Sequence, residues 1–236
     1  MVGNDIVDLT DSKTKEKSRD MRFMNRVFTS AEQLDILESS KPDIVLWSLW
    51  AAKETGYKAI SKLHPTVSSA PGYYEVKLFS ADGSLPETGV VHTPCGQVSV
   101  CFFISSDHIH CIGTTPDKDT DSIMWDVRKI YRRRFSPDYE SDLVRNMAGK
   151  KIARYLKKDS KAIEIIRPKG HRGLGPPVIY AGKKRTAIDI SMSHDGPFVA
   201  YALQDTNNHI QPSHNFHYPF APIRHEKCFT LAATTC

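Results

Sequence analysis

The stretch Trp50-Ala51-Ala52-Lys53-Glu54-Thr55-Gly56-Tyr57-Lys58 places Glu54 and Lys58 four residues apart, on one face of a predicted helix. A second stretch, Val2-Gly3-Asn4-Asp5-Ile6-Val7-Asp8-Leu9, is an apolar strand that contains an acid, Asp5. Burial of a carboxylate is unfavourable unless a cation neutralises it. Two acids from different elements can share one hard divalent ion, while lysines hold phosphates beside it. The two stretches therefore predict a site that binds a metal ion and a phosphorylated ligand.

The composition is that of a globular protein. The chain has 236 residues, of which 40% are hydrophobic and 25% charged, enough for one large domain or two of about 100–150 residues. No apolar run is long enough to span a membrane, and the first residues lack the pattern of a secretory signal, so we expect a cytoplasmic protein with no membrane partner. The five cysteines are odd in number and form no CxxC pair, which argues against a disulfide framework or a zinc site.

Part of the net charge of +5 is concentrated in three basic clusters. They lie within 128–134, 150–158 and 183–185. Such clusters fit a polyanionic partner, which can be nucleic acid, a nucleotide cofactor or an acidic protein. A solvated basic helix face remains the alternative for each cluster.

Local signals place two helices in the first half. Thr29 and Glu32 have the spacing of a capping box, which predicts a helix over 30–39. Pro42 suits the first turn of a longer helix over 42–63, and Pro65 ends it. The aromatic residues of that helix are interpreted as core packing rather than as a ligand-stacking surface.

Strands and a second long helix complete the expected fold. We predict strands over 73–80, 97–104, 108–114 and 162–167, a helix over 138–158, and a hairpin over 186–204 that turns at Asp195-Gly196. The polar segment 115–122 is the expected linker. We therefore expect an α+β pseudo-dimer of two similar lobes, each a long helix packed on a small antiparallel sheet. The expected parts are a first lobe (1–115), a second lobe (123–204) and a flexible tail (205–236).

Several motifs now resemble the 4′-phosphopantetheinyl transferase superfamily. Gly3-Asn4-Asp5-Ile6 is similar to its Gly-x-Asp-Ile signature, and Trp50 to Lys58 resembles its Trp-x-x-Lys-Glu-x-x-x-Lys helix. The segment 22–32 resembles its Arg-Phe…Phe-Thr-x-x-Glu motif, and 191–196 resembles its Ser-His hairpin. Arg145 to Gly149 is similar to an Arg-x-x-x-Gly helix that contacts coenzyme A. The likeness covers the chain to about Leu203.

The resemblance implies an enzyme that moves the phosphopantetheine arm of coenzyme A onto a serine of an apo acyl or peptidyl carrier protein and releases adenosine 3′,5′-bisphosphate. Mg²⁺ is the implied ion, with Asp5 and Glu54 as its ligands. The implied catalytic residues are Glu54, Lys58 and Asp5, and the base is either Glu54 or a metal-bound water. The carrier can belong to fatty acid, polyketide or nonribosomal peptide biosynthesis. Since one chain supplies both lobes, we expect a monomer.

The resemblance also implies a set of coenzyme contacts. These are Lys53, Lys58, Arg145, Arg172, Gly175, Ser193 and His194. Lys58 is assigned to the diphosphate and Arg145 to the 3′-phosphate, whereas a solvated position remains open for Lys53. Arg22 and Arg26 are expected either to meet the acidic carrier or to be plain surface charges.

Three departures from the superfamily pattern stand out. The lobe order is swapped relative to its two-lobed members, because the Ser-His hairpin follows the acidic motifs here. Val7 occupies a position where those members have a further metal-binding acid. Pro176 replaces a lysine, which puts one phosphate or adenine contact in doubt and leaves Arg172 or Lys169 as a substitute.

Two other functions compete with this interpretation. A catalytically degenerate protein that only binds coenzyme A or a carrier would keep the same motifs. A nucleic-acid-binding protein would use the basic clusters, but these clusters are not interleaved with aromatic residues as in stacking platforms, apart from Tyr131, Phe135 and Tyr155. We therefore expect no nucleic-acid partner.

Overall fold

The structure is a computed structural model that describes residues 1–80, 85–116, 118–131, 137–170 and 173–207. It combines antiparallel sheets with four α-helices in the described part of the chain, so the expected α+β class is confirmed. The division into two similar lobes stays a prediction, and we keep "first lobe" and "second lobe" as names for 1–115 and 123–204. The predicted tail lies outside the described residues from 208 onward.

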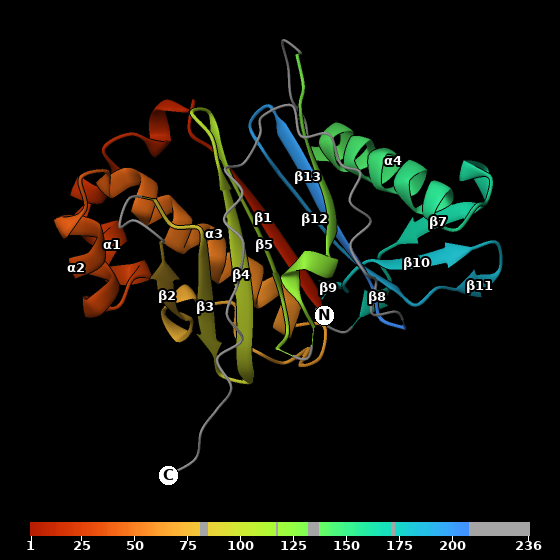
Figure 1. The fold of residues 1–236 in the computed structure, drawn as a ribbon, viewed down its shortest axis with the longest axis horizontal. Helices are drawn as coiled ribbons and strands as arrows, with labels where there is room; N and C mark the ends of the chain where they lie inside the picture. The colour runs from red at the N-terminus through yellow and green to blue at the C-terminus, as the bar shows by residue number, and fades with distance from the viewer. Residues whose placement is uncertain (81–84, 117, 132–136, 171–172, 208–236) are drawn as a thin grey trace.

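The first lobe is a five-stranded antiparallel sheet covered by helices. Its strands follow the order β1-β5-β4-β3-β2. The bounds are β1 Val2–Asp8, β2 Glu75–Phe79, β3 Thr88–Thr93, β4 Gly96–Ile104 and β5 His108–Thr114. The helices are α1 Met21–Val27, α2 Ser30–Glu38 and α3 Pro42–Ile60. Helix α3 packs along one face of the sheet (Figure 1).

The second lobe places one long helix, α4 Pro137–Tyr155, against the sheet β12-β13-β6. The strands of that sheet are β6 Met124–Lys129, β12 Ile188–Asp195 and β13 Phe198–Asp205. A smaller sheet contains β7 Ile163–Ile166, β10 Val178–Ala181 and β11 Lys184–Arg185, and a short hairpin pairs β8 Lys169–Gly170 with β9 Gly173–Leu174. Strand β1 lies beside β12 and β13 at the centre of the molecule (Figure 1).

Most predicted elements are confirmed, and their ends have local causes. Thr29 and Glu32 form the capping box of α2, and Pro42 occupies the first turn of α3. Helix α4 ends three residues before the predicted limit because Lys157 takes a left-handed conformation with φ 52°. At the predicted hairpin turn Gly196 has φ 51°, which glycine adopts without strain.

The sequence did not predict three of the longer strands, β3, β6 and β10. Strand β6 ends within the basic cluster at 128–134, and β10 follows directly after Pro177, and neither stretch was assigned to an element. Strand β6 pairs with the distant strand β13, whereas β10 pairs with β7 and β3 pairs with its neighbours β2 and β4. Long-range pairing, which local propensity does not encode, decides β6.

Strand β1 is fully buried, and its alternate residues serve the two lobes. Asp5 and Val7 face α3, where Val7 joins the apolar core of the first lobe. Val2, Asn4 and Ile6 face the second lobe, where Ile6 packs with Phe198. This alternation follows from the two-residue period of a strand. The alternation also explains why position 7 is apolar, because an acid there would be buried in the apolar core of the first lobe.

Gly3 sets the distance between β1 and α3. A Cβ atom at this position would collide with the backbone carbonyl of Thr55, the residue that follows Glu54. We expect Gly3→Ala to lower the free energy of unfolding by about 1–3 kcal/mol, since α3 must move away from the strand. Urea unfolding measures the change. Gly72→Ala is the matched control, because its Cβ would meet nothing within 4 Å; equal losses in both variants would contradict the prediction.

Candidate functional site

Asp5 lies at the centre of the candidate site. Its carboxylate is 2.7 Å from the ammonium group of Lys58, which also donates to the backbone oxygen of Asn4. Burial raises the pKa of Asp5, and the neighbouring charge of Lys58 opposes that rise. Lys58 is therefore the cation that neutralises the buried carboxylate of Asp5.

Glu54 faces the same place from one helical turn earlier on α3. Burial raises the pKa of its carboxyl group, the negative charge of Asp5 raises it further, and Lys58 lowers it. The two acids are thus close enough to repel each other, although they are on different elements. Among the described residues, no hydrogen bond or ion pair to the Glu54 carboxylate is found, so its oxygens are available to a ligand.

The late hairpin approaches the same place from the second lobe. The charge of His194 acts on Asp5 and lowers the pKa of that acid. The His194 Nδ1 atom is 3.0 Å from a carboxylate oxygen of Glu140, a buried residue in the first turn of α4. Glu140 therefore orients the imidazole ring, and the site draws on three elements: β1, α3 and the β12–β13 hairpin.

Comparison with known proteins finds a relationship for the first part of the chain, which contains Asp5, Glu54 and Lys58. Residues 1–88 match the family model of the 4′-phosphopantetheinyl transferase superfamily. The resemblance to this superfamily is confirmed for that part of the chain. The chain is also 39% identical over 59 residues to the holo-[acyl-carrier-protein] synthase of Protochlamydia amoebophila (strain UWE25). That match covers 25% of this chain and spans about half of the relative, 48% of its length.

The matched residues include both acids and Lys58, but not the second lobe. The superfamily match ends at residue 88, so Ser193 and His194 lie outside it. Their place near Asp5 comes from the fold alone.

No helix in the described part of the chain is long and apolar enough to cross a membrane.

Lys53 does not fit its predicted contact with the coenzyme. Its side chain is 1% exposed and forms an ion pair of 2.8 Å with Glu32, which is equally buried. Its ammonium also donates to the backbone oxygens of Pro71 and Tyr74. Lys53 therefore ties α3 to α2 and to the start of β2, and the superfamily's Lys-Glu pair combines one structural residue with one candidate site residue.

Ser193 is buried and points toward β1. Its hydroxyl accepts a hydrogen bond of 2.9 Å from the side-chain amide of Asn4. The same amide lies 3.3 Å from Nε2 of His110, a fully buried histidine on β5. The hydroxyl proton of Ser193 remains available, but its first role in this structure is to join the hairpin to β1.

His110 makes the protein sensitive to acid. Burial lowers the pKa of His110 to about 3, so the ring is neutral in the folded protein. The pKa in the folded protein is below the unfolded value of 6.5. The neutral ring's contribution to the free energy of unfolding is therefore fully present above pH 6.5 and is lost as the pH falls toward 3. The loss is about 1.4 kcal/mol per pH unit, or on the order of 3 kcal/mol between pH 6.5 and 4.

His110→Gln is expected to remove this loss while it keeps a partner for Asn4. Urea unfolding of both proteins from pH 7.5 to pH 4 measures the difference. The variant should lose less stability than wild type as the pH falls. Parallel curves for the two proteins would contradict the prediction.

The remaining predicted contacts lie away from the two acids or outside the described residues. Arg145 pairs with Asp142 on its own helix and lines a hollow of about 510 Å³ beside β7, together with Lys150 and Lys161. The backbone N–H of Gly175 donates to Pro168. Arg172 lies outside the described residues. The structure therefore brings Asp5, Glu54, Lys58 and His194 together, whereas the contacts found for Arg145 and Gly175 are with other residues of the second lobe.

The donor set fits a small divalent ion. Asp5 and Glu54 offer two carboxylates that repel each other, and a divalent cation between them would relieve that repulsion. Mg²⁺ is commonly held by one or two carboxylates while water and phosphate oxygens complete its coordination. The described residues contain no cluster of three or more acids, cysteines or histidines that could hold a metal. The site therefore matches a shared, ligand-completed ion better than an all-protein cage.

Sequence reasoning missed Asn4 and Glu140, which contact Ser193 and His194, and it missed the ion pair of 2.9 Å between Lys62 and Asp189. Lys62 continues the face of Glu54 and Lys58 by one more turn, and Asp189 shares the polar face of Ser191 and Ser193. These periodicities were visible signals. Which partner each residue meets was not, because the partners are distant in sequence.

Proposed function

We propose that the protein transfers the 4′-phosphopantetheine arm of coenzyme A to a serine hydroxyl of an apo carrier protein and releases adenosine 3′,5′-bisphosphate. The observation that supports this most is the convergence of Asp5, Glu54, Lys58 and His194, which come from three separate elements of the chain, β1, α3 and β12. The superfamily match over residues 1–88 supports the same reaction class. The proposal also keeps the two lobes, 1–115 and 123–204, as the units that meet there.

In the proposed reaction the serine oxygen forms a bond to the β-phosphorus of the coenzyme. The bond from that phosphorus to the bridging oxygen breaks, and the nucleotide leaves with that oxygen. The reaction depends on positioning and on charge neutralisation rather than on covalent chemistry by the protein. Lys58 supplies positive charge from α3, and the imidazole of His194 offers ring nitrogens from the hairpin.

Glu54 is the candidate base in this proposal. Burial and the charge of Asp5 raise its pKa in the metal-free protein. A bound cation would lower that pKa again and make Glu54 a weaker base, which favours a water molecule as the proton relay. Glu54 takes the serine proton either directly or through a water molecule. Asp5 and Glu54 would hold Mg²⁺, which when bound neutralises charge on the diphosphate oxygens.

The hollow beside Arg145 is the proposed place for the 3′-phosphate. Arg145, Lys150 and Lys161 surround it, and Asp142 is the acid among its lining residues. The surplus of positive charge favours a phosphate over a neutral group. A coenzyme bound there would extend along α4 toward Glu140 and His194.

A panel of carriers tests the proposal. The protein is incubated with coenzyme A, Mg²⁺ and apo carriers from fatty acid, polyketide and nonribosomal peptide systems, and intact mass spectrometry measures the gain of one phosphopantetheine arm. Carriers with the acceptor serine changed to alanine are the control. No gain on any carrier sinks the proposal, and coenzyme binding without transfer favours the degenerate, binding-only function.

A further inference from the structure

The polar face of β12, formed by Asp189, Ser191, Ser193 and Asp195, contacts β1 along its length, and we call this contact the join. Strand β1 is the edge strand of its sheet, and its free N–H groups are satisfied by side chains instead of by another backbone. Val2 N–H donates to Asp189, Asn4 N–H to Ser191 and Asp8 N–H to Asp195, at 2.7, 3.0 and 2.8 Å. In all three bonds the partners are 187 residues apart, so the two strands run parallel in one fixed register.

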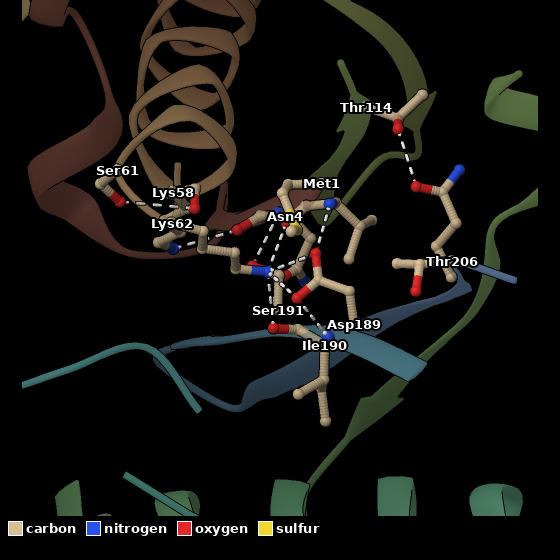
Figure 2. Close-up of polar contacts among 12 residues, drawn as sticks. Met1, Asn4, Lys58, Ser61, Lys62, Thr114, Asp189, Ile190, Ser191 and Thr206 are labelled. Carbon is tan, nitrogen blue, oxygen red and sulfur yellow. Dashed lines mark hydrogen bonds and ion pairs between the residues drawn. The ribbon is translucent and has the colours of Figure 1, made fainter. Parts of the chain in front are cut away.

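Lys62 closes one end of this join. Its ammonium is 2.9 Å from the Asp189 carboxylate and also donates to the backbone oxygens of Val2 and Ile190, at 2.7 and 2.8 Å. Figure 2 shows the side chain reaching from the end of the helix α3 to the first residues of β1 and to β12. The side chains of Lys62 and Asp189 are only 5% and 11% exposed. Lys62 lies just beyond the end of α3. Its buried ammonium therefore connects that end of the helix to both β1 and β12.

These are the elements that carry the candidate site. Lys62 lies four residues beyond Lys58, Val2 lies three residues before Asp5, and Asp189 lies four residues before Ser193. A strand advances about 3.3 Å per residue, so the pair lies about 10 Å along β1 from Asp5 and about 13 Å along β12 from Ser193. A shift of one residue between β1 and β12 would turn Ser193 away from Asn4 and move His194 relative to Asp5.

We propose that Lys62 and Asp189 are a positioning pair, which sets the register of β12 on β1 and thereby the distance between the metal-binding acids and the coenzyme-binding hairpin. The inference rests on the proposed transfer reaction for its catalytic part. It goes beyond that reaction because neither residue touches the reacting groups. A displacement of about 1 Å in such a site can cost 10²-fold in rate.

The main test variant is Lys62→Met combined with Asp189→Asn. It removes both charges together, so no unpaired charge is left buried, and asparagine keeps an oxygen acceptor for Val2. Neutral replacement of a buried ion pair is often well tolerated, so we expect the variant to fold. If it does not fold, Asp189→Asn alone serves as the second variant, because Lys62 then keeps its two backbone acceptors.

Amide hydrogen exchange followed by NMR gives a readout that does not depend on activity. The amides of Asn4 and Asp8 face β12 and are expected to exchange at least tenfold faster in the variant. The amides of Gly3, Asp5 and Val7 alternate with them and face β5, so they are an internal control and should be unchanged. This pattern would show a loosened join within an intact first lobe.

Kinetics give the second readout. We expect a kcat/KM for coenzyme A at least tenfold below wild type, with a fall in kcat and a rise in KM at an unchanged folded fraction by circular dichroism. The control variant, Glu16→Gln with Arg19→Met, removes an exposed ion pair of the first lobe and should behave as wild type.

Each outcome decides the inference. Faster exchange of Asn4 and Asp8 together with impaired kinetics supports the positioning role. Unchanged exchange, or faster exchange with wild-type kinetics, overturns it and leaves the proposed transfer reaction intact. If the wild-type protein transfers nothing to any carrier, the proposed function fails first and the catalytic part of the inference falls with it, while exchange still reports whether the join is real.

Discussion

The Glu54→Gln variant is expected to transfer phosphopantetheine about 10³-fold more slowly than wild type, within the range of losses for general acid–base groups. Glutamine has nearly the same shape but cannot accept the serine proton and binds a divalent ion poorly. The fold should be retained, because Glu54 is only partly buried and its charge is repelled by Asp5 in the unliganded protein. Single-turnover mass spectrometry on an apo carrier measures the rate.

A matched control separates the role of Glu54 from a general loss of charge. Glu38→Gln makes the same chemical change on the exposed surface of α2 and should leave transfer unaffected. Thermal unfolding of both variants checks that they are folded. Full activity of Glu54→Gln would refute its assigned role, even if Asp5 proved essential.

The Lys53→Met variant is expected to lose about 3–5 kcal/mol of unfolding free energy, the usual cost when one partner of a buried ion pair is removed. Glu32 would stay buried without its ammonium, and two backbone oxygens would lose a donor. Urea unfolding measures the loss. Molecules that remain folded should bind coenzyme A with wild-type affinity.

This experiment separates two interpretations of the Lys-Glu motif. Removal of a side chain that contacts the coenzyme would change the affinity for coenzyme A far more than the free energy of unfolding. Removal of a structural side chain would change the free energy of unfolding far more than the affinity. Arg19→Met, which breaks an exposed ion pair, is the control and should cost less than about 1 kcal/mol. Weak coenzyme binding with unchanged stability would restore the original prediction for Lys53.

Much of the site was predictable because its signals are local or periodic. Glu54 and Lys58 share a helix face by their spacing, and the strand character of β1 follows from its apolar run. Lys53 shows where this reasoning ends. It differs from Glu54 by one position, and the sequence left open whether it contacts a ligand or solvent, but α2 and β2 enclose that side of α3.

The amino-acid sequence by itself determined the α+β class, the two long helices, the turn at Gly196 and the identity of the two acids. Caps, prolines and residue periods act within a few neighbours, so they can be recognised without a fold. Only the tertiary structure decided that Lys62 meets Asp189, 127 residues away, and that His194 approaches Asp5. Such contacts depend on how whole elements pack and on which charges become buried together, and no local pattern specifies that.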